Sequence, residues 1–276
     1  FRSRQLQYLG RISWGIPNMS TFPRRGWLAA LLALCTAACA AGPVPATLAQ
    51  LDPVGQYQIK GQTVSKNRTY TGELKIEPNG PGFALAWHLD HGDIYRGTAL
   101  VTGNVLGAVY WDGNGPGHDL GIVVYRIDGG ILRGTWMLAA PKITTAGRED
   151  LKGSADLQGR YEVILGQNPE HHGRYGGYVE IDHNGPTYEL RWFVPSLAFV
   201  GKGVRVGDVL VVGYSSTVAP GVIAYCLTKN GGAGVWSHGR AEGLGAEVIA
   251  RDGTAIGDLA SGQPDCKGAG SQAQAD

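Results

Sequence analysis

Residues 70–87 read YTGELKIEPNGPGFALAW, and residues 175–192 read YGGYVEIDHNGPTYELRW. The two stretches share Tyr, Gly, Ile, the triplet Asn-Gly-Pro and the final Trp at a constant offset of 105 positions. Apolar and polar residues alternate on both sides of an Asn-Gly pair, and these two residue types tolerate the positive φ of a tight hairpin turn. The sequence therefore predicts an antiparallel β-hairpin that occurs twice in the chain.

The correspondence extends well beyond the hairpin. The segment Gly55–Lys152 reappears, with gaps, as Gly159–Ala250. The later matched residues, after the offset has fallen to 104, 100 and finally 98, are Tyr110 with Tyr214, Tyr125 with Tyr225, Trp136 with Trp236, and Glu149 with Glu247. A repeat of about 100 residues is the size of a domain and exceeds the roughly 20–50 residues of a solenoid unit. We therefore expect function to lie in a duplicated module.

Each copy consists of about eight short runs that alternate with period two, and no segment carries a helical stripe. The 44 glycines stand alone or in turn pairs, which is typical of many tight turns. Sequential strands joined by short turns favour a meander, and a sheet of about eight strands can close and so lose its edges. The predicted fold class is all-β, with two tandem antiparallel up-and-down β-barrels of about eight short strands each.

Domain boundaries follow from the repeat and from the composition of the two ends. The expected divisions are upstream residues plus a signal peptide at 1–49, a first β-barrel at 50–152, a linker at 153–158, a second β-barrel at 159–251 and a tail at 252–276. The tail is rich in Gly, Ala, Ser and Gln without apolar periodicity, and we expect it to be disordered.

The first residues resemble an export signal. Met19 is followed by Arg24 and Arg25, an apolar run that ends at Leu34, and then small residues, which is the order of a secretory signal peptide. The run is shorter than the about 20 apolar residues of a membrane span. Residues 1–18 are expected to be translated upstream sequence. Cleavage is expected after Ala49, with cleavage after Ala40 as the alternative.

This signal predicts an exported protein of the periplasm or cell surface of a bacterium. A lipoprotein form is an alternative, because Ala37-Ala38-Cys39 resembles a lipobox, although Thr36 stands where leucine is usual. Lipidation of Cys39 is the only route by which we expect the protein to contact a membrane.

Charge and cysteine usage narrow the partners. Residues 1–49 hold five of the 24 basic residues and none of the 23 acidic ones, so the remaining chain has 19 basic against 23 acidic residues, a net charge of −4. No basic stripe is present, and a nucleic-acid partner is not expected. Cys226 and Cys266 could pair in an exported protein. The first copy has Arg126 where the second has Cys226, and the sequence leaves the pairing open.

Three features together resemble a known group of barrels. They are a Gly-x-aromatic opening (Gly55 to Tyr57, Gly159 to Tyr161), a meander of about eight strands, and a Gly-x-Trp near the end of each copy. The chain resembles small barrels of the lipocalin and avidin (calycin) type, and more closely the exported bacterial proteins built from one or two such barrels, some of which are labelled fibronectin-binding. Tyr stands where the lipocalin opening has Trp.

The resemblance covers about Gly55–Ala250. It implies a barrel that binds a small apolar or aromatic molecule in its cup, or an extracellular matrix protein through its loops.

Candidate ligand-binding residues are the aromatic side chains that recur at the same strand phase in both copies. They are Trp87, Trp136, Trp192, Trp236, Tyr125 and Tyr225. They could line a cup that stacks on one small molecule, or they could be core residues of small barrels. Glu149 and Glu247 recur near the closing strand and could lock the closure or contact a ligand. The loops Trp111–Leu120 and Gln167–Arg174 differ between the copies and could carry specificity.

A second candidate cluster consists of His88, Asp90 and His91. These residue types can bind a divalent metal or perform acid–base chemistry. The second copy lacks them, and a solvated hairpin is the alternative. The mature region contains no Gly-x-Ser-x-Gly elbow, phosphate loop, zinc-protease motif or dinucleotide fingerprint.

The expectation is an exported, non-enzymatic binding protein without a cofactor. One alternative is a periplasmic hydrolase or metal-dependent enzyme that uses His88, Asp90 and His91. A further alternative is a structural module of the envelope.

Overall fold

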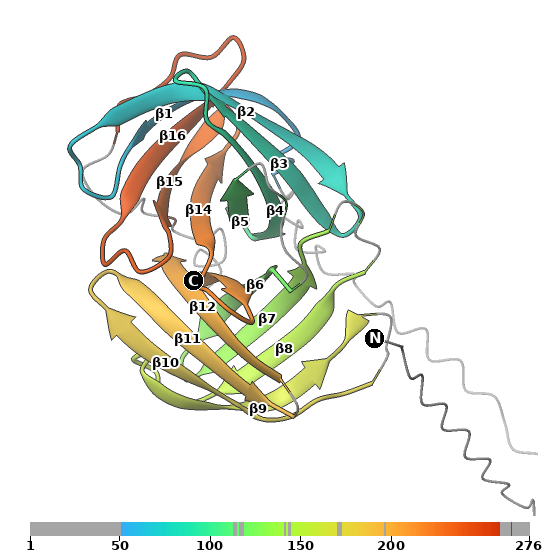
Figure 1. Cartoon of the computed structure of the whole chain (residues 1–276). Helices are drawn as coiled ribbons and strands as arrows, with labels where there is room; N and C mark the ends of the chain where they lie inside the picture. Colours follow the sequence, from blue (N-terminus) through green and yellow to red (C-terminus); the bar gives the residue numbers. More distant parts are fainter. Residues whose placement is uncertain are drawn as a thin grey trace, which may run out of the picture. The chain divides into compact units, whose positions relative to one another are not determined.

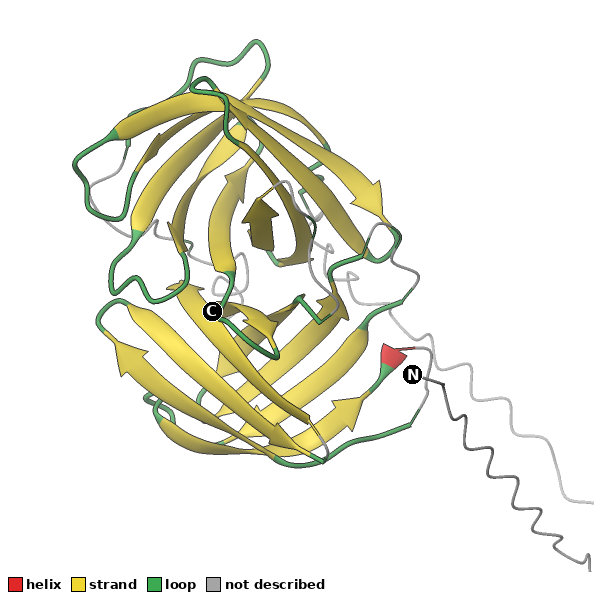
Figure 2. Ribbon diagram, viewed as in Figure 1, coloured by secondary structure: helices red, strands yellow, loops and turns green. Residues whose placement is uncertain are grey.

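The computed structural model describes residues 51–112, 115, 119–140, 142, 145–169, 173–195, 197–259 and 266. These residues form an all-β structure, and strands account for most of the ribbon in Figure 2. The strands close into two antiparallel barrels of eight strands each, which confirms the predicted fold class. The predicted hairpin turns are present in both copies, with Gly80 at φ 61° and Gly185 at φ 59°.

We name the barrels A and B. Barrel A consists of β1 (Gly55–Gln62), β2 (Thr69–Asn79), β3 (Gly82–Leu89), β4 (Ile94–Thr102), β5 (Val105–Asp112), β14 (Gly221–Thr228), β15 (Gly231–Ser237) and β16 (Gly245–Arg251). Barrel B consists of β6 (Gly121–Asp128), β7 (Ile131–Leu138), β8 (Gly147–Lys152), β9 (Gly159–Gln167), β10 (Tyr178–Asn184), β11 (Thr187–Val194), β12 (Leu197–Val206) and β13 (Val209–Ser215).

The two copies of the repeat therefore exchange strands. In barrel A, β5 of the first copy pairs with β14 of the second, and the ring closes where β1 pairs with β16. Figure 1 shows this closure as the blue β1 beside the red β16. In barrel B, β6 of the first copy pairs with β13 of the second. The expected boundaries, with one barrel at 50–152 and the other at 159–251, do not coincide with the barrels and are wrong.

The exchange is permitted because the two candidate partner strands carry equivalent residues. Gly221 of β14 lies opposite Tyr110 of β5, and Gly121 of β6 lies opposite Tyr214 of β13. A Cβ on Gly221 or Gly121 would stand 2.4 or 2.3 Å from the tyrosine ring, so the ring occupies the space above the glycine in both pairings. Because β5 and β13 offer β6 and β14 the same register, local pairing alone does not select between them.

The exchange also changes the structural role of the segment Trp111–Leu120, which the sequence predicts to be a loop within one barrel. This segment connects β5 of barrel A to β6 of barrel B and is a crossover between barrels. Residues 113, 114 and 116–118 of it lie outside the described residues.

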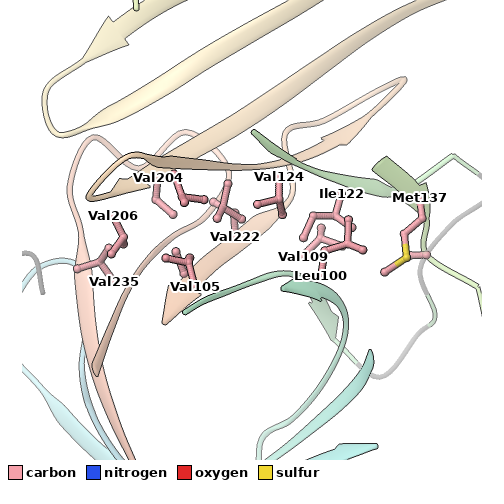
Figure 3. Packing of buried hydrophobic residues seen from close by; sticks show 14 of the residues in the cluster. Leu100, Val105, Val109, Ile122, Val124, Met137, Val204, Val206, Val222 and Val235 are labelled. Carbon is pink, nitrogen blue, oxygen red and sulfur yellow. The ribbon is translucent and has the colours of Figure 1, made fainter. Parts of the chain in front are cut away.

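Among the described residues, buried apolar side chains form three clusters. One lies inside barrel A around Tyr57 and Leu74, and a second lies inside barrel B around Tyr161 and Leu190. The third lies between the barrels and is rich in valine (Figure 3). Barrel A contributes Leu100, Val105 and Val109 to this cluster. Barrel B contributes Val124, Val204 and Val206.

Two glycines allow close packing between the barrels. Gly107 of β5 lies against Val211 of β13, and a Cβ on Gly107 would be 2.6 Å from Val211 Cγ1. The second such pair is Gly213 of β13 against Val109 of β5, where a Cβ would be 2.9 Å from Val109 Cγ2. Each valine thus fills the space left by the missing side chain of a glycine on the facing strand.

Cys266 contacts both barrels. Cys226 on β14 forms a disulfide with Cys266, which is 3% exposed. The carbonyl oxygen of Cys266 lies 2.6 Å from the position a Cβ would take on Gly207, in the turn that joins β12 to β13. The disulfide therefore holds Cys266 between strand β14 of barrel A and a turn of barrel B.

The expectation of a disordered tail at 252–276 is wrong at Cys266. Residues 252–259 carry no helix or strand, and 260–265 and 267–276 lie outside the described residues. Residues 1–49, with the predicted signal peptide and Cys39, also lie outside the described residues. In the part of the chain that is described, no helix is both long and apolar enough to cross a membrane.

Candidate functional site

A buried carboxyl group stands at the centre of barrel A. Glu247 of β16 points inward and is 3% exposed. The hydroxyl of Tyr70 donates a hydrogen bond to Glu247 Oε2 at 2.7 Å, and the hydroxyl of Tyr225 donates one to Oε1. The indole Nε1 of Trp87 donates to Oε1 at 3.3 Å and lies 3.1 Å from the Tyr225 hydroxyl. We call these four residues carboxyl cluster A.

The same arrangement recurs in barrel B. Glu149 of β8 accepts hydrogen bonds from the hydroxyl of Tyr175 at 3.0 Å, from the hydroxyl of Tyr125, and from Trp192 Nε1 at 3.0 Å. We call these residues carboxyl cluster B. The four positions correspond one by one to those of cluster A in the sequence repeat.

Each cluster draws two residues from each copy of the repeat. Tyr70 and Trp87 of cluster A belong to the first copy, whereas Tyr225 and Glu247 belong to the second. In cluster B the first copy supplies Tyr125 and Glu149, and the second copy supplies Tyr175 and Trp192. Strand exchange is therefore what completes both clusters.

Burial dominates the electrostatics of the clusters. It raises the pKa of Glu247 and of Glu149, because removal from water disfavours the charged carboxylate, while the tyrosine and tryptophan hydrogen bonds act in the opposite direction. Burial, and then the charge of Glu247, raise the pKa of Tyr70 and of Tyr225 far above the ordinary value for tyrosine. The tyrosines therefore remain neutral hydrogen-bond donors, and each carboxyl group is the acceptor at the centre of its network.

Barrel A contains a cavity of about 1040 Å³ that reaches cluster A. Six aromatic side chains line it, namely Tyr70, Trp87, Tyr95, Tyr110, Trp111 and Trp236. The charged and imidazole residues that line it are Arg68, His91, Asp93, Asp112, His238, Glu242 and Glu247. The cavity is large enough for one small organic molecule, with apolar aromatic walls and a few polar groups, as is usual for ligand sites.

One polar atom in this wall is poorly satisfied. Among the described residues, the buried indole Nε1 of Trp236 makes no hydrogen bond of good geometry, although its interaction with the Tyr70 hydroxyl acts to lower the pKa of Tyr70. Its ring packs edge-on against Tyr70 at a centroid distance of 6.4 Å. In barrel B the matching Trp136 packs against Tyr175 at 6.4 Å, and its Nε1 likewise makes no hydrogen bond of good geometry within the described part of the chain, while acting to lower the pKa of Tyr175. An unsatisfied buried N–H is costly, and an acceptor on a bound molecule would relieve that cost.

The structure divides the six predicted cup residues equally between the barrels. Trp87, Trp236 and Tyr225 lie in barrel A, where Trp87 and Trp236 line the cavity and Tyr225 is fully buried with its hydroxyl on Glu247. Trp192 and Tyr125 are in the buried core of barrel B, and Trp136 packs against that core. Trp87 is both a core residue and a cavity wall, since it is 4% exposed and lines the cavity.

The histidine cluster does not converge. His88, Asp90 and His91 are all exposed. His91 Nε2 lies 2.9 Å from Asp93 Oδ2, while Asp90 accepts a hydrogen bond from Thr71. Among the described residues, no group of three His, Cys, Asp or Glu side chains is placed to hold a metal ion. His91 and Asp93 instead lie on the wall of the barrel A cavity.

Sequence reasoning did not identify Tyr70 and Tyr175 as site residues. Both had been matched as repeat positions, and their convergence on Glu247 and Glu149 depends on the closed sheet. Tyr95, Tyr110 and Trp111 were likewise not singled out as cavity residues. The usable signal was the coincidence of repeated tyrosines, tryptophans and a repeated glutamate in one module.

Comparison of the chain with protein-family models finds no match. Comparisons with curated proteins and with solved structures find none either. The observed class is therefore defined by the fold and its clusters, as an all-β protein of two strand-exchanged barrels, each with a buried carboxyl group.

Proposed function

We propose that the protein is an exported, non-enzymatic binding protein that holds one small aromatic molecule in the cavity of barrel A. The observation that carries this proposal is the cavity itself, whose wall combines six aromatic rings with the buried carboxyl of Glu247. Aromatic walls supply apolar contact area and stacking, and a few fixed polar groups orient the ligand.

Three further points support the proposal. The buried Nε1 of Trp236 makes no hydrogen bond of good geometry to the residues that the structure describes, so it offers a donor that a ligand acceptor can satisfy better than Tyr70 does. The disulfide between Cys226 and Cys266 is consistent with export, because disulfides persist in oxidising compartments. The resemblance to lipocalin-type and avidin-type barrels points in the same direction, since a cup is where such barrels hold their ligands.

The test uses a neutral fluorescent probe, N-phenyl-1-naphthylamine, titrated into the full protein. We expect saturable enhancement of the probe's fluorescence in the wild type. The variant Leu89→Trp places a larger side chain on the cavity wall and is expected to weaken binding by about tenfold or more, since overfilling a packed site displaces its occupant.

The matched control is Leu197→Trp, because Leu197 lies on β12 of barrel B and is 58% exposed. This variant is expected to bind the probe as the wild type does. Equal affinity of the wild type and Leu89→Trp, or the absence of saturable binding in the wild type, would contradict the proposal.

A further inference from the structure

We infer that the ligand of the barrel A cavity is an organic cation, an aromatic or alkyl ammonium compound whose charged nitrogen lies against Glu247 and the rings of Trp87 and Trp236. This inference rests on the proposed function and adds the chemical class of the ligand. Three independent features of the cavity support it.

The first feature is the balance of charge on the wall. Four carboxylates line the cavity, from Asp93, Asp112, Glu242 and Glu247, against one guanidinium, from Arg68. With histidine counted as neutral, the formal charge of these lining residues is −3 when Glu247 is ionised and −2 when it is protonated, the form that burial favours. A cleft lined mainly by one sign of charge raises the local concentration of the opposite sign and speeds its entry. The wall therefore favours cations over neutral or anionic molecules of the same shape.

The second feature is the hydrogen-bonding capacity left on Glu247. A carboxylate has about four acceptor positions on its two oxygens. Among the described residues, Tyr225 and Trp87 donate to Oε1 and Tyr70 donates to Oε2. With respect to these residues Oε2 has capacity for a further donor, and Glu247 is part of the cavity wall. An ammonium N–H fills this position with a charge-assisted hydrogen bond.

The third feature is the aromatic character of the rest of the wall. A cation within about 6 Å of a tryptophan or tyrosine face is attracted by the ring quadrupole, and sets of such rings recognise ammonium groups. Trp87 packs against Tyr110 at a centroid distance of 6.1 Å, and Tyr110 packs against Tyr95 at 5.8 Å. Trp236 and these rings line the same cavity as Glu247.

The experiment compares ligands that differ in charge and little in shape. Binding of 2-phenylethylamine, 2-phenylethanol and 3-phenylpropionate to the full protein is measured by isothermal titration calorimetry at pH 7.5 and low salt. Benzyltrimethylammonium is added as a cation without an N–H donor. We expect the amine to bind at least about tenfold more tightly than the alcohol, and the carboxylate to bind most weakly, because a charge-assisted hydrogen bond is worth roughly twice a neutral one.

Benzyltrimethylammonium is expected to bind more weakly than the amine and more tightly than the alcohol, since it retains the cation–π attraction without the hydrogen bond to Glu247. Equal affinities of amine and alcohol, or a preference for the carboxylate, would overturn the inference. Both comparisons are made on the wild-type protein and need no substitution.

The matched variants are Glu247→Gln and Glu149→Gln, which remove the same charge from cluster A and cluster B. Glu247→Gln is expected to lower the affinity for the amine by about tenfold or more and the affinity for the alcohol by less than about threefold, because only the charged contact is lost. Glu149→Gln is expected to bind the amine with the same affinity as the wild type. Equal weakening of the amine by both variants would contradict a site at Glu247.

A rim variant covers the case in which Glu247→Gln fails to fold. Asp93 is exposed on the cavity wall, and Asp93→Asn is expected to weaken the amine about two- to fivefold at low salt and to have little effect at high salt, where such charges are screened. An unchanged affinity at low salt counts against the charge argument. If N-phenyl-1-naphthylamine binds in the cavity while the amine shows no preference, the proposed function stands and the cation inference fails.

Discussion

Tyr70 and Glu247 are separated by 177 positions in the chain, yet the Tyr70 hydroxyl donates a hydrogen bond of 2.7 Å to the Glu247 carboxyl group. Tyr70 comes from the first copy of the repeat and Glu247 from the second. The contact exists because β1 to β5 of one copy close into a barrel with β14 to β16 of the other. Neither copy alone contains a complete carboxyl cluster.

Strand exchange makes a direct prediction for a cut chain. A protease recognition site inserted between Ala155 and Asp156, in the exposed connection from β8 to β9, separates the two copies covalently. We expect the fragments to co-elute on gel filtration in native buffer and to separate only in denaturant, because each barrel requires strands from both. Cys226 and Cys266 lie on the same fragment, so the disulfide does not hold the two together. Separation in native buffer would contradict the exchange.

The buried carboxyl groups predict how stability depends on pH. Burial raises the pKa of Glu247 in the folded state above its unfolded value, so the favourable contribution of this group is present at low pH and is lost as the pH rises through the folded pKa. The groups that face Glu247 are Tyr70 of β2, Trp87 of β3 and Tyr225 of β14, all neutral in this range. The variant Glu247→Gln has no such charge.

The free energy of unfolding of the wild type, relative to that of Glu247→Gln, is therefore expected to fall as the pH is raised from 4 to 8. Each unit of pKa difference between the folded and unfolded states corresponds to about 1.4 kcal/mol. Urea unfolding of both proteins across this pH range measures the difference. A difference that stays constant with pH, or one that grows in favour of the wild type, would show that the carboxyl group is not shifted upward.

The disulfide predicts a loss of stability on removal. Cys226 and Cys266 are 40 positions apart, and a loop of this length corresponds to roughly 3–4 kcal/mol in the chain-entropy account of disulfide stabilisation. Cys266→Ser is expected to lower the free energy of unfolding by about this amount. Reduced wild type serves as the control and should match the variant. Oxidised and reduced wild type with the same unfolding midpoint in urea would refute the role assigned to the bond.

The contact between the barrels predicts the effect of a single methyl group. Gly107→Ala would bring a Cβ to 2.6 Å from Val211 Cγ1, so we expect a destabilisation of about 1–3 kcal/mol from overpacking. Gly176→Ala is the matched control, because nothing lies within 4 Å of the added Cβ at that position.

The double variant Gly107→Ala/Val211→Ala should recover part of the loss, since it removes the clashing methyl groups of the valine. Chemical denaturation of the wild type, Gly107→Ala, Val211→Ala and the double variant measures the coupling between the two sites. Equal stability of Gly107→Ala and Gly176→Ala would show that the added methyl group at position 107 meets no steric conflict with Val211.

The sequence predicted the closed barrels because their determinants are local. Asn79-Gly80 and Asn184-Gly185 specify hairpins through backbone geometry, and the period-two alternation specifies which face is buried. Strand exchange was not predictable in this way. Tyr110 and Tyr214 each lie opposite a glycine at the equivalent position of the partner strand, so either partner strand satisfies the pattern of residues.

The candidate site was foreseen in part for the same reason. Trp87 and Trp236 were identified because they repeat at one strand phase, and the repeat also marked Glu247. Tyr70 could not be assigned to the carboxyl cluster from sequence. Its partner Glu247 lies on β16, and β16 comes close to Tyr70 only because it pairs with β1 and closes the barrel. The pairing of Cys226 with Cys266 was also left open, because no matching cysteines in the first copy indicated it.

The order in which the chain is synthesised gives the interleaved strands a further consequence. Barrel B is built from the contiguous strands β6 to β13, so all of its parts have emerged once Ser215 has been made. The earlier strands β1 to β5 must wait as an unfinished sheet with two unpaired edges until β16 appears, and such edges invite association with other chains. The part of the protein that is made first is therefore completed last, and the cavity that it encloses comes into being only with the final strand.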